Sequence, residues 1–230
     1  SLVSAGDHVL VLGSVYGPTT QFLRYLGKFG VTHDHVGDPE MLDSAIKPTT
    51  RVLYFESPSY MRYAIVDIAA VAEWAHAHGL VAVMDNTWST PIFQKPLTLG
   101  VDLVVHSLSK YIGGHGDLVG GAVIGPARLI RPLALTEYQL YGAAMSPHDA
   151  AKVIKGLRTL PVRMRAHQER GLAVARFLAG HPAVRAVHHP GLPGHPGHRL
   201  ALRQMTGFSS VFGIELCPDD RAEVAAFLDR

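Results

Sequence analysis

Short apolar runs alternate with helical patterns through roughly the first 135 residues, and this alternation restricts the fold more than any other feature of the sequence. The segments at residues 19–30 and 67–79 have helical spacing and end at a glycine, as helices commonly do. The apolar runs between them are nearly continuous, which is typical of strands buried on both faces. The pattern predicts an α/β fold with a mostly parallel sheet. Five runs carry the strand signal: HVLVLG (8–13), RVLYFESP (51–58), LVAVMDN (80–86), VDLVVHS (101–107) and GGAVIG (120–125).

Polar side chains follow three of these predicted strands at the point where each strand ends. They are Glu56 and Ser57 at the end of the second run, Asp85 and Asn86 at the end of the third, and Ser107, Ser109 and Lys110 at the end of the fourth. Ligands of open α/β sheets bind outside the carboxyl ends of the strands. We therefore expect these side chains to converge on one binding site.

A change of pattern near residue 146 predicts a second domain. Residues 147–178 are helical in pattern, with a break or kink expected at Pro161. Residues 183–198 follow, rich in proline and glycine, and are predicted to form a strand and an ordered loop. A strand at 209–216 and the start of a helix at 221–230 come next. We assign residues 1–145 to a large domain and residues 146–230 to a connecting helix and the start of a smaller α+β domain. SLVSAGDHVLVLG begins at a helix end and AAFLDR stops within a helical pattern, so both domains are expected to be incomplete.

Composition excludes several classes of function. The formal net charge is +2, from 21 basic and 19 acidic residues, which provides no electrostatic reason to expect a nucleic-acid partner. No run is long and apolar enough for a membrane helix. Cys217 is the one cysteine, which fits a reducing, cytoplasmic location. The 14 histidines lack the spacing of metal ligands, so no metal site is predicted.

Lys110 lies in VVHSLSKYIGGHGD, between an apolar strand and a glycine-rich loop. It could be a surface charge, a phosphate clamp or a covalent catalyst. A phosphate-binding P-loop places its glycines before the lysine, whereas here they follow it. A lysine that binds pyridoxal phosphate as a Schiff base needs a carboxylate for the ring nitrogen, donors for the phosphate and a ring to stack on. Asp85, the Ser107 and Ser109 hydroxyls, and Tyr16 can supply these groups, which favours the cofactor reading.

The segment VMDNTWSTPIFQKPLTLGVDLVVHSLSKYIGGHGDLVGGAV resembles the cofactor-lysine region of the pyridoxal-phosphate (PLP) enzymes of cysteine and methionine metabolism. VYGPTTQF and FESPS extend this similarity, which covers essentially the whole chain. The resemblance implies a fold type I, aspartate aminotransferase-like enzyme with PLP as its cofactor. It also implies Lys110 as the Schiff-base residue, Asp85 on the pyridinium nitrogen, Ser107 and Ser109 at the phosphate, and Tyr16 stacked on the ring.

Within this family, the resemblance is closest to the bacterial cystathionine beta-lyases. Gamma-type enzymes usually read Glu-Ser-Pro-x-Asn, whereas this chain reads ESPSY, with Tyr60 in place of the asparagine. The resemblance implies β-elimination of L-cystathionine to homocysteine, pyruvate and ammonia in methionine biosynthesis by trans-sulfuration, with Lys110 and Tyr16 as catalytic residues.

Two alternatives stay open. One is a cystathionine gamma-synthase or a gamma-lyase, including methionine gamma-lyase, and the other is an inactive fragment that keeps the fold. The resemblance further implies a small sulfur amino acid as substrate and a homotetramer built from dimers. It places the family's upstream phosphate loop and its downstream carboxylate-binding arginine outside this chain.

Overall fold

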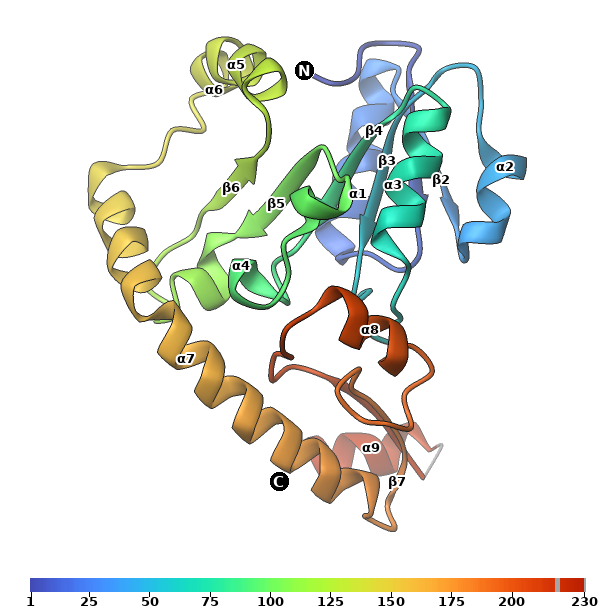
Figure 1. The fold of residues 1–230 in the computed structure, drawn as a ribbon, viewed down its shortest axis with the longest axis vertical. Helices are drawn as coiled ribbons and strands as arrows, with labels where there is room; N and C mark the ends of the chain where they lie inside the picture. The colour runs from blue at the N-terminus through green and yellow to red at the C-terminus, as the bar shows by residue number, and fades with distance from the viewer. Residues whose placement is uncertain (218–219, 230) are drawn as a thin grey trace.

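The structure, a computed structural model, describes residues 1–217 and 220–229 of the chain. Its main feature is a six-stranded sheet with the strand order β2-β1-β3-β4-β5-β6 (Figure 1). Strands β1 to β5 run parallel, and β6 pairs antiparallel with β5, so the prediction of a mostly parallel sheet is confirmed. The strands are β1 (His8–Leu12), β2 (Thr32–Val36), β3 (Thr50–Glu56), β4 (Val81–Asp85), β5 (Leu103–Ser107) and β6 (Gly121–Ile124).

Strand β2 has no counterpart among the predicted strands. Its sequence, THDHV, is mostly polar, and it lies at one edge of the sheet, where Val36 is the one buried residue of the strand. Its backbone pairs with β1 from His8 opposite Thr32 to Leu12 opposite Val36. An exposed edge strand needs little apolar burial, so hydrophobic patterning does not reveal it.

The central strands β1, β3 and β4 are largely buried on both faces, to which their successive side chains point in turn. Leu10 and Leu12 of β1 pack in the cluster that includes residues of α3 (Ile68–Ala77). Val9 and Val11 pack on the other face, in the cluster that receives a side chain from α1 (Gly17–Leu26). In Figure 1, α3 lies in front of the sheet and α1 behind it. This two-sided burial explains the continuous apolar runs in the sequence.

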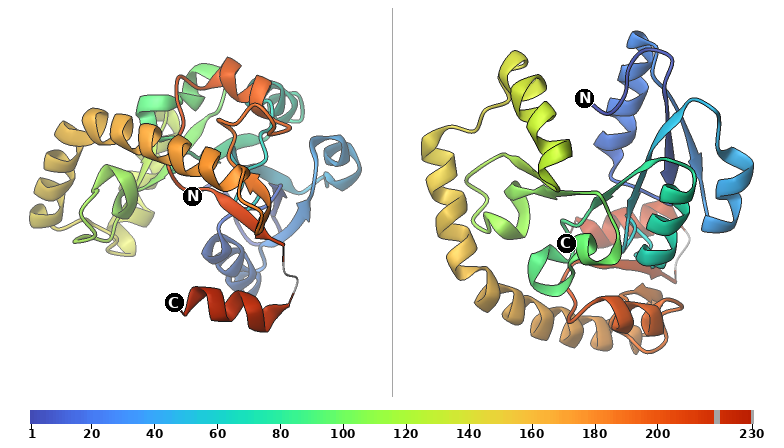
Figure 2. Two further views of the ribbon diagram at one scale, coloured as in Figure 1. Left: turned by 90° about the horizontal axis from the view of Figure 1, so that it is seen from below. Right: turned by 45° about the horizontal axis from the view of Figure 1, so that its top comes forward.

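A single long helix, α7 (Pro147–Ala179), leads away from the main sheet (Figures 1 and 2). The Ser146 side chain caps its first turn by accepting a hydrogen bond from the Asp149 backbone N–H. The helix continues through Pro161, so the expected break does not occur there. Proline inside a helix costs about 3 kcal/mol. Burial of Leu160 and Met164 against the main domain, 1% and 0% exposed, offsets this cost.

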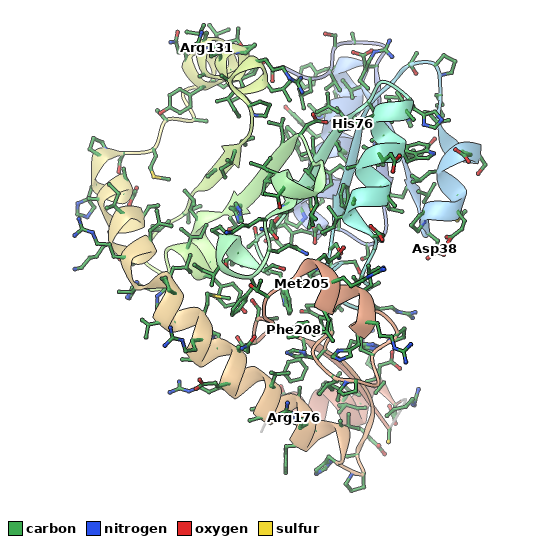
Figure 3. The ribbon with its side chains drawn as sticks, viewed as in Figure 1. Asp38, His76, Arg131, Arg176, Met205 and Phe208 are labelled. Atoms are coloured by element: carbon green, nitrogen blue, oxygen red, sulfur yellow. The ribbon has the colours of Figure 1, made fainter. Side chains whose placement is uncertain are left out.

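After α7 the chain forms a two-stranded antiparallel sheet of β7 (Val184–His188) and β8 (Gly213–Leu216). Strand β8 covers the second half of the strand predicted at 209–216. Met205 and Phe208, labelled in Figure 3, follow α8 (His198–Gln204) and pack with Ile65 and Trp88 of the main domain. The division into domains at 145/146 stays a prediction.

The remaining helical segments are η1 (Gly27–Phe29), η2 (Pro39–Met41), α2 (Leu42–Ala45), α4 (Thr90–Phe93), η3 (Pro96–Leu99), η4 (Leu108–Ile112), α5 (Ala127–Leu135), α6 (Glu137–Leu140) and α9 (Arg221–Leu228).

Within the described ranges, none of the helices combines the length and the apolar character that crossing a membrane requires.

Candidate active site

A pocket of about 510 Å³ opens at the carboxyl ends of β1, β3, β4 and β5. Four of the five predicted site residues line it: Tyr16, Asp85, Ser107 and Lys110. They come from positions up to 94 residues apart, and the parallel sheet brings them together because its strand ends share one edge.

Lys110 lies in a tight turn directly after β5. Its backbone leaves the helical region within η4, with φ −93° and ψ −127°, so the turn is broken at the lysine itself. The Gly114 N–H donates to the Lys110 carbonyl at 2.8 Å. The side chain of Lys110 is exposed on the pocket side and is therefore available to a bound molecule.

A side chain of helix α7 binds the backbone of this turn. The Arg163 guanidinium donates to the carbonyl oxygens of Tyr111 at 2.6 Å and Ile112 at 3.3 Å. It also donates to the Gly156 carbonyl, two turns earlier in the same helix, at 2.9 Å. Hydrogen bonds from a charged donor are stronger than neutral ones, so Arg163 fixes the residues that follow Lys110.

Asp85 is the last residue of β4 and is half-buried. Burial raises the pKa of its carboxyl, whereas the Thr87 hydroxyl and backbone N–H act in the opposite direction. The Thr87 N–H donates to Asp85 Oδ1 at 2.8 Å. The Thr87 hydroxyl in turn accepts the Ser107 N–H at 2.7 Å, which ties the end of β4 to the end of β5.

The two serines behave differently. Ser107 lines the pocket, whereas the Ser109 hydroxyl turns toward Gly120. It accepts the Gly120 N–H at 3.0 Å and lies 3.4 Å from the Gly120 carbonyl oxygen. Ser109 thereby ties the turn that holds Lys110 to the start of β6.

Tyr16 precedes the first turn of α1 and is 44% exposed. Its ring meets that of Tyr60 edge to face, with 6.0 Å between the centroids. Its backbone N–H donates to Glu56 Oε1 at 2.7 Å. Tyr60, which replaces the asparagine of the gamma-type pattern, therefore lies in the same pocket as Tyr16.

Sequence reasoning assigned no role to several other residues that line the pocket. Glu56 stood out as a strand-end residue without a function, while Arg163 and His167 come from α7. His167 Nδ1 lies 3.0 Å from the Ser210 hydroxyl, which also lies 3.2 Å from the Tyr111 hydroxyl. Arg163 and His167 are four residues apart and so share a helix face, but that spacing alone does not say which face meets the pocket.

The chain is similar to known proteins over almost its whole length. The family model for Cys/Met metabolism PLP-dependent enzymes matches residues 1–230. The chain is 43% identical over 220 residues to L-methionine gamma-lyase of Pseudomonas putida, covering 94% of this chain and 55% of the relative. It is 40% identical over 220 residues to cystathionine beta-lyase of Coxiella burnetii, covering 94% and 57%.

A solved structure of cystathionine gamma-lyase from Lactobacillus plantarum, complexed with L-serine, matches with a TM-score of 0.90 and 39% identity. That match covers 94% of this chain and 58% of the other. This chain therefore spans a little more than half the length of these relatives.

These findings confirm the predicted fold type I, because this mostly parallel α/β chain matches the solved structures of cystathionine gamma-lyase from Lactobacillus plantarum and of metB from Corynebacterium glutamicum, each with a TM-score of 0.90. The predicted cofactor is confirmed as that of the family, whose members depend on PLP. The relatives include lyases and synthases with several substrate preferences. The chain belongs to the Cys/Met metabolism family of PLP-dependent enzymes.

Proposed function

We propose that this chain forms the central part of a PLP-dependent carbon–sulfur lyase that performs β-elimination on L-cystathionine. The observation that carries the proposal is the presence of the Lys110 amine and the Asp85 carboxylate in one pocket, at the ends of neighbouring strands. The products would be homocysteine, pyruvate and ammonia.

The groups in the pocket fit the cofactor. Burial has raised the pKa of Asp85, and a protonated ring nitrogen beside the carboxylate would lower it again. Ser107 would donate to the phosphate. The Ser109 hydroxyl accepts the Gly120 N–H and donates to the Gly120 carbonyl at 3.4 Å, so it would join Ser107 at the phosphate by giving up that donation. Tyr16 would stack on the ring from the end of β1.

When bound, PLP supplies an electron sink for the negative charge that develops at the substrate Cα. Lys110 would hold the cofactor covalently and, once released by the substrate amine, remove the Cα proton as a general base. Asp85 would keep the ring nitrogen protonated. Tyr16 would deprotonate the incoming amine or protonate the sulfur that leaves when the Cβ–S bond breaks. Water then converts the remaining three-carbon fragment to pyruvate and ammonia.

A gamma-lyase is the second candidate, supported by the 43% identity to a methionine gamma-lyase. Tyr60, in place of the asparagine of the gamma-type pattern, supports the β-elimination instead. An assay with cystathionine separates them: pyruvate with homocysteine indicates β-elimination, and 2-oxobutyrate with cysteine indicates γ-elimination. The second product pair would overturn the β-lyase proposal.

The third candidate, an inactive fragment, is distinguished by spectroscopy. A chain that forms the Schiff base has a visible absorbance band that borohydride removes, and a chain without the band would support the inactive fragment. A homotetramer of paired dimers and a cytoplasmic location belong to the same proposal and rest on the family resemblance. Light scattering on the cofactor-loaded protein tests the tetramer.

A further inference from the structure

The catalytic scheme above leaves one carboxyl of the pocket without a role. Glu56 is the last residue of β3 and lies opposite Asp85 in the register of β3 with β4. Both carboxyls line the same pocket, and both are partly buried. Two carboxyl groups at adjacent strand ends repel each other when both are ionised, so one of them retains its proton more strongly.

The environments of the two carboxyls decide which one retains the proton. Burial, followed by the charge of Asp85, raises the pKa of Glu56 to about 8, although the Tyr16 N–H acts against this. Hydrogen bonds from the hydroxyl and the backbone N–H of Thr87 lower the pKa of Asp85, against the effect of burial. The Thr87 donors therefore favour the ionised form of Asp85, whereas burial favours the protonated form of Glu56.

The titratable groups around Glu56 are consistent with this order. Asp85 faces it from β4, Tyr16 from the turn before α1, and Tyr54 lies two residues earlier on the same strand. Lys110 lines the same pocket from beyond β5. Burial, with added repulsion from the Asp85 charge, also raises the pKa of Tyr54, so this side of the pocket disfavours extra negative charge.

Glu56 also has a specific contact. Its Oε1 accepts the Tyr16 backbone N–H at 2.7 Å, across 40 residues of sequence. That N–H belongs to the residue before α1, where the first N–H groups of a helix lack partners within the helix. The hydrogen bond ties the start of α1 to the end of β3, and with it the position of the Tyr16 ring.

We propose that Glu56 is a positioning residue, which acts as a neutral carboxylic acid that holds Tyr16 over the pocket and leaves Asp85 as the ionised carboxylate of the pair. The part of this inference that concerns Tyr16 in turnover rests on the proposed function. The part that concerns the proton on Glu56 is independent of it.

Two variants separate hydrogen bonding from protonation. Glu56→Gln keeps an acceptor for the Tyr16 N–H but cannot ionise, and Glu56→Met has a similar length without an acceptor. The first measurement is urea denaturation of the cofactor-free protein from about pH 5 to about pH 9. A carboxyl whose pKa is raised by folding contributes stability that is present at low pH and is lost as the pH rises through its folded pKa. The wild type is therefore expected to lose stability relative to Glu56→Gln over this range.

A difference between wild type and Glu56→Gln that does not change with pH would overturn the protonated state of Glu56. The second measurement uses the cofactor-loaded protein. Glu56→Met is expected to have a kcat/KM with cystathionine about tenfold lower than that of Glu56→Gln, the scale of one lost hydrogen bond. Equal values for the two variants would overturn the positioning role. If instead the wild type itself does not turn over cystathionine, the proposed function fails, while the urea result still decides whether Glu56 holds a proton.

Discussion

Gly156 of α7 lies so close to the carbonyl oxygen of Ile112 that a Cβ atom added to the glycine would approach it to under 3.0 Å. Ile112 ends the turn that carries Lys110, and the Gly113 carbonyl is also within 3.0 Å of the same point. Arg163, two helical turns further along, bonds to the carbonyls of Tyr111 and Ile112. The long helix therefore sets the position of the Lys110 turn through the close backbone approach at Gly156 and the hydrogen bonds of the Arg163 side chain.

Gly156→Ala is expected to destabilise the protein, although alanine favours a helix by about 1 kcal/mol over glycine. Overpacking of this kind typically costs about 1–3 kcal/mol, because the contacts are with backbone atoms that cannot turn away. Urea denaturation measures the change, and the visible band of the bound cofactor reports whether the Lys110 turn has moved. Gly194→Ala is the control, since a Cβ atom there meets nothing within 4 Å. Equal effects of the two substitutions would contradict the close packing.

Lys110→Ala is expected to abolish the visible absorbance of the bound cofactor and to lower kcat with cystathionine on the order of a thousandfold or more. The variant should fold normally, because the Lys110 side chain is exposed. Lys95→Ala, at another exposed lysine, serves as the control and should retain both properties. Turnover by Lys110→Ala at the wild-type rate would refute the assignment of the catalytic base.

Asp85→Asn is expected to lower kcat on the order of a hundredfold, because an amide cannot keep the ring nitrogen protonated. The amide oxygen can still accept the Thr87 N–H, and burial no longer acts on an ionisable group, so thermal stability should be maintained. Comparing kcat with the melting temperature tests this. A loss of stability in proportion to the loss of rate would assign Asp85 a structural role instead.

Because His106 is buried, we expect the free energy of unfolding to fall in acid. It is 4% exposed, and burial lowers its pKa to about 4 from a usual value of 6.5. The unfolded chain takes up the proton first, so stability present above pH 6.5 is lost as the pH falls through about 4, up to roughly 3 kcal/mol. In His106→Leu, the urea midpoint should change less with pH between these values than in the wild type. In His148→Leu, at an exposed histidine, it should change with pH as it does in the wild type. An unchanged slope in His106→Leu would show that another group titrates.

The position of the pocket could be predicted from the strand ends, because it depends on the topology of the sheet rather than on the packing of individual side chains. Once alternating patterns predict a parallel sheet, the residues after its strands must share one edge, and Asp85, Ser107 and Lys110 do so. The same reasoning could not separate Ser107 from Ser109. Both lie close to Lys110 in the sequence, and only the structure shows that the Ser109 hydroxyl bonds to Gly120, before β6.

The sequence patterns did not predict strand β2 or the residues that α7 contributes to the pocket. Strand β2 stayed hidden because an edge strand buries little apolar surface. Arg163 and His167 carry no signal of their own, since α7 contains five arginines and two histidines and the sequence does not show which of them meet the pocket. Their roles follow from how α7 packs against η4, which no pattern within α7 predicts.

The sequence by itself determined the α/β class, the strands with buried faces, the family and the chemical groups available at the strand ends. These properties depend on local periodicity and on contiguous motifs, which are present in the order of the residues. Only the tertiary structure decided that Glu56 faces Asp85, that its carboxyl holds Tyr16, and that α7 clamps the turn after Lys110. These relationships depend on strand register and on packing between segments that lie 29 to 52 residues apart, where small differences in geometry decide which atoms meet.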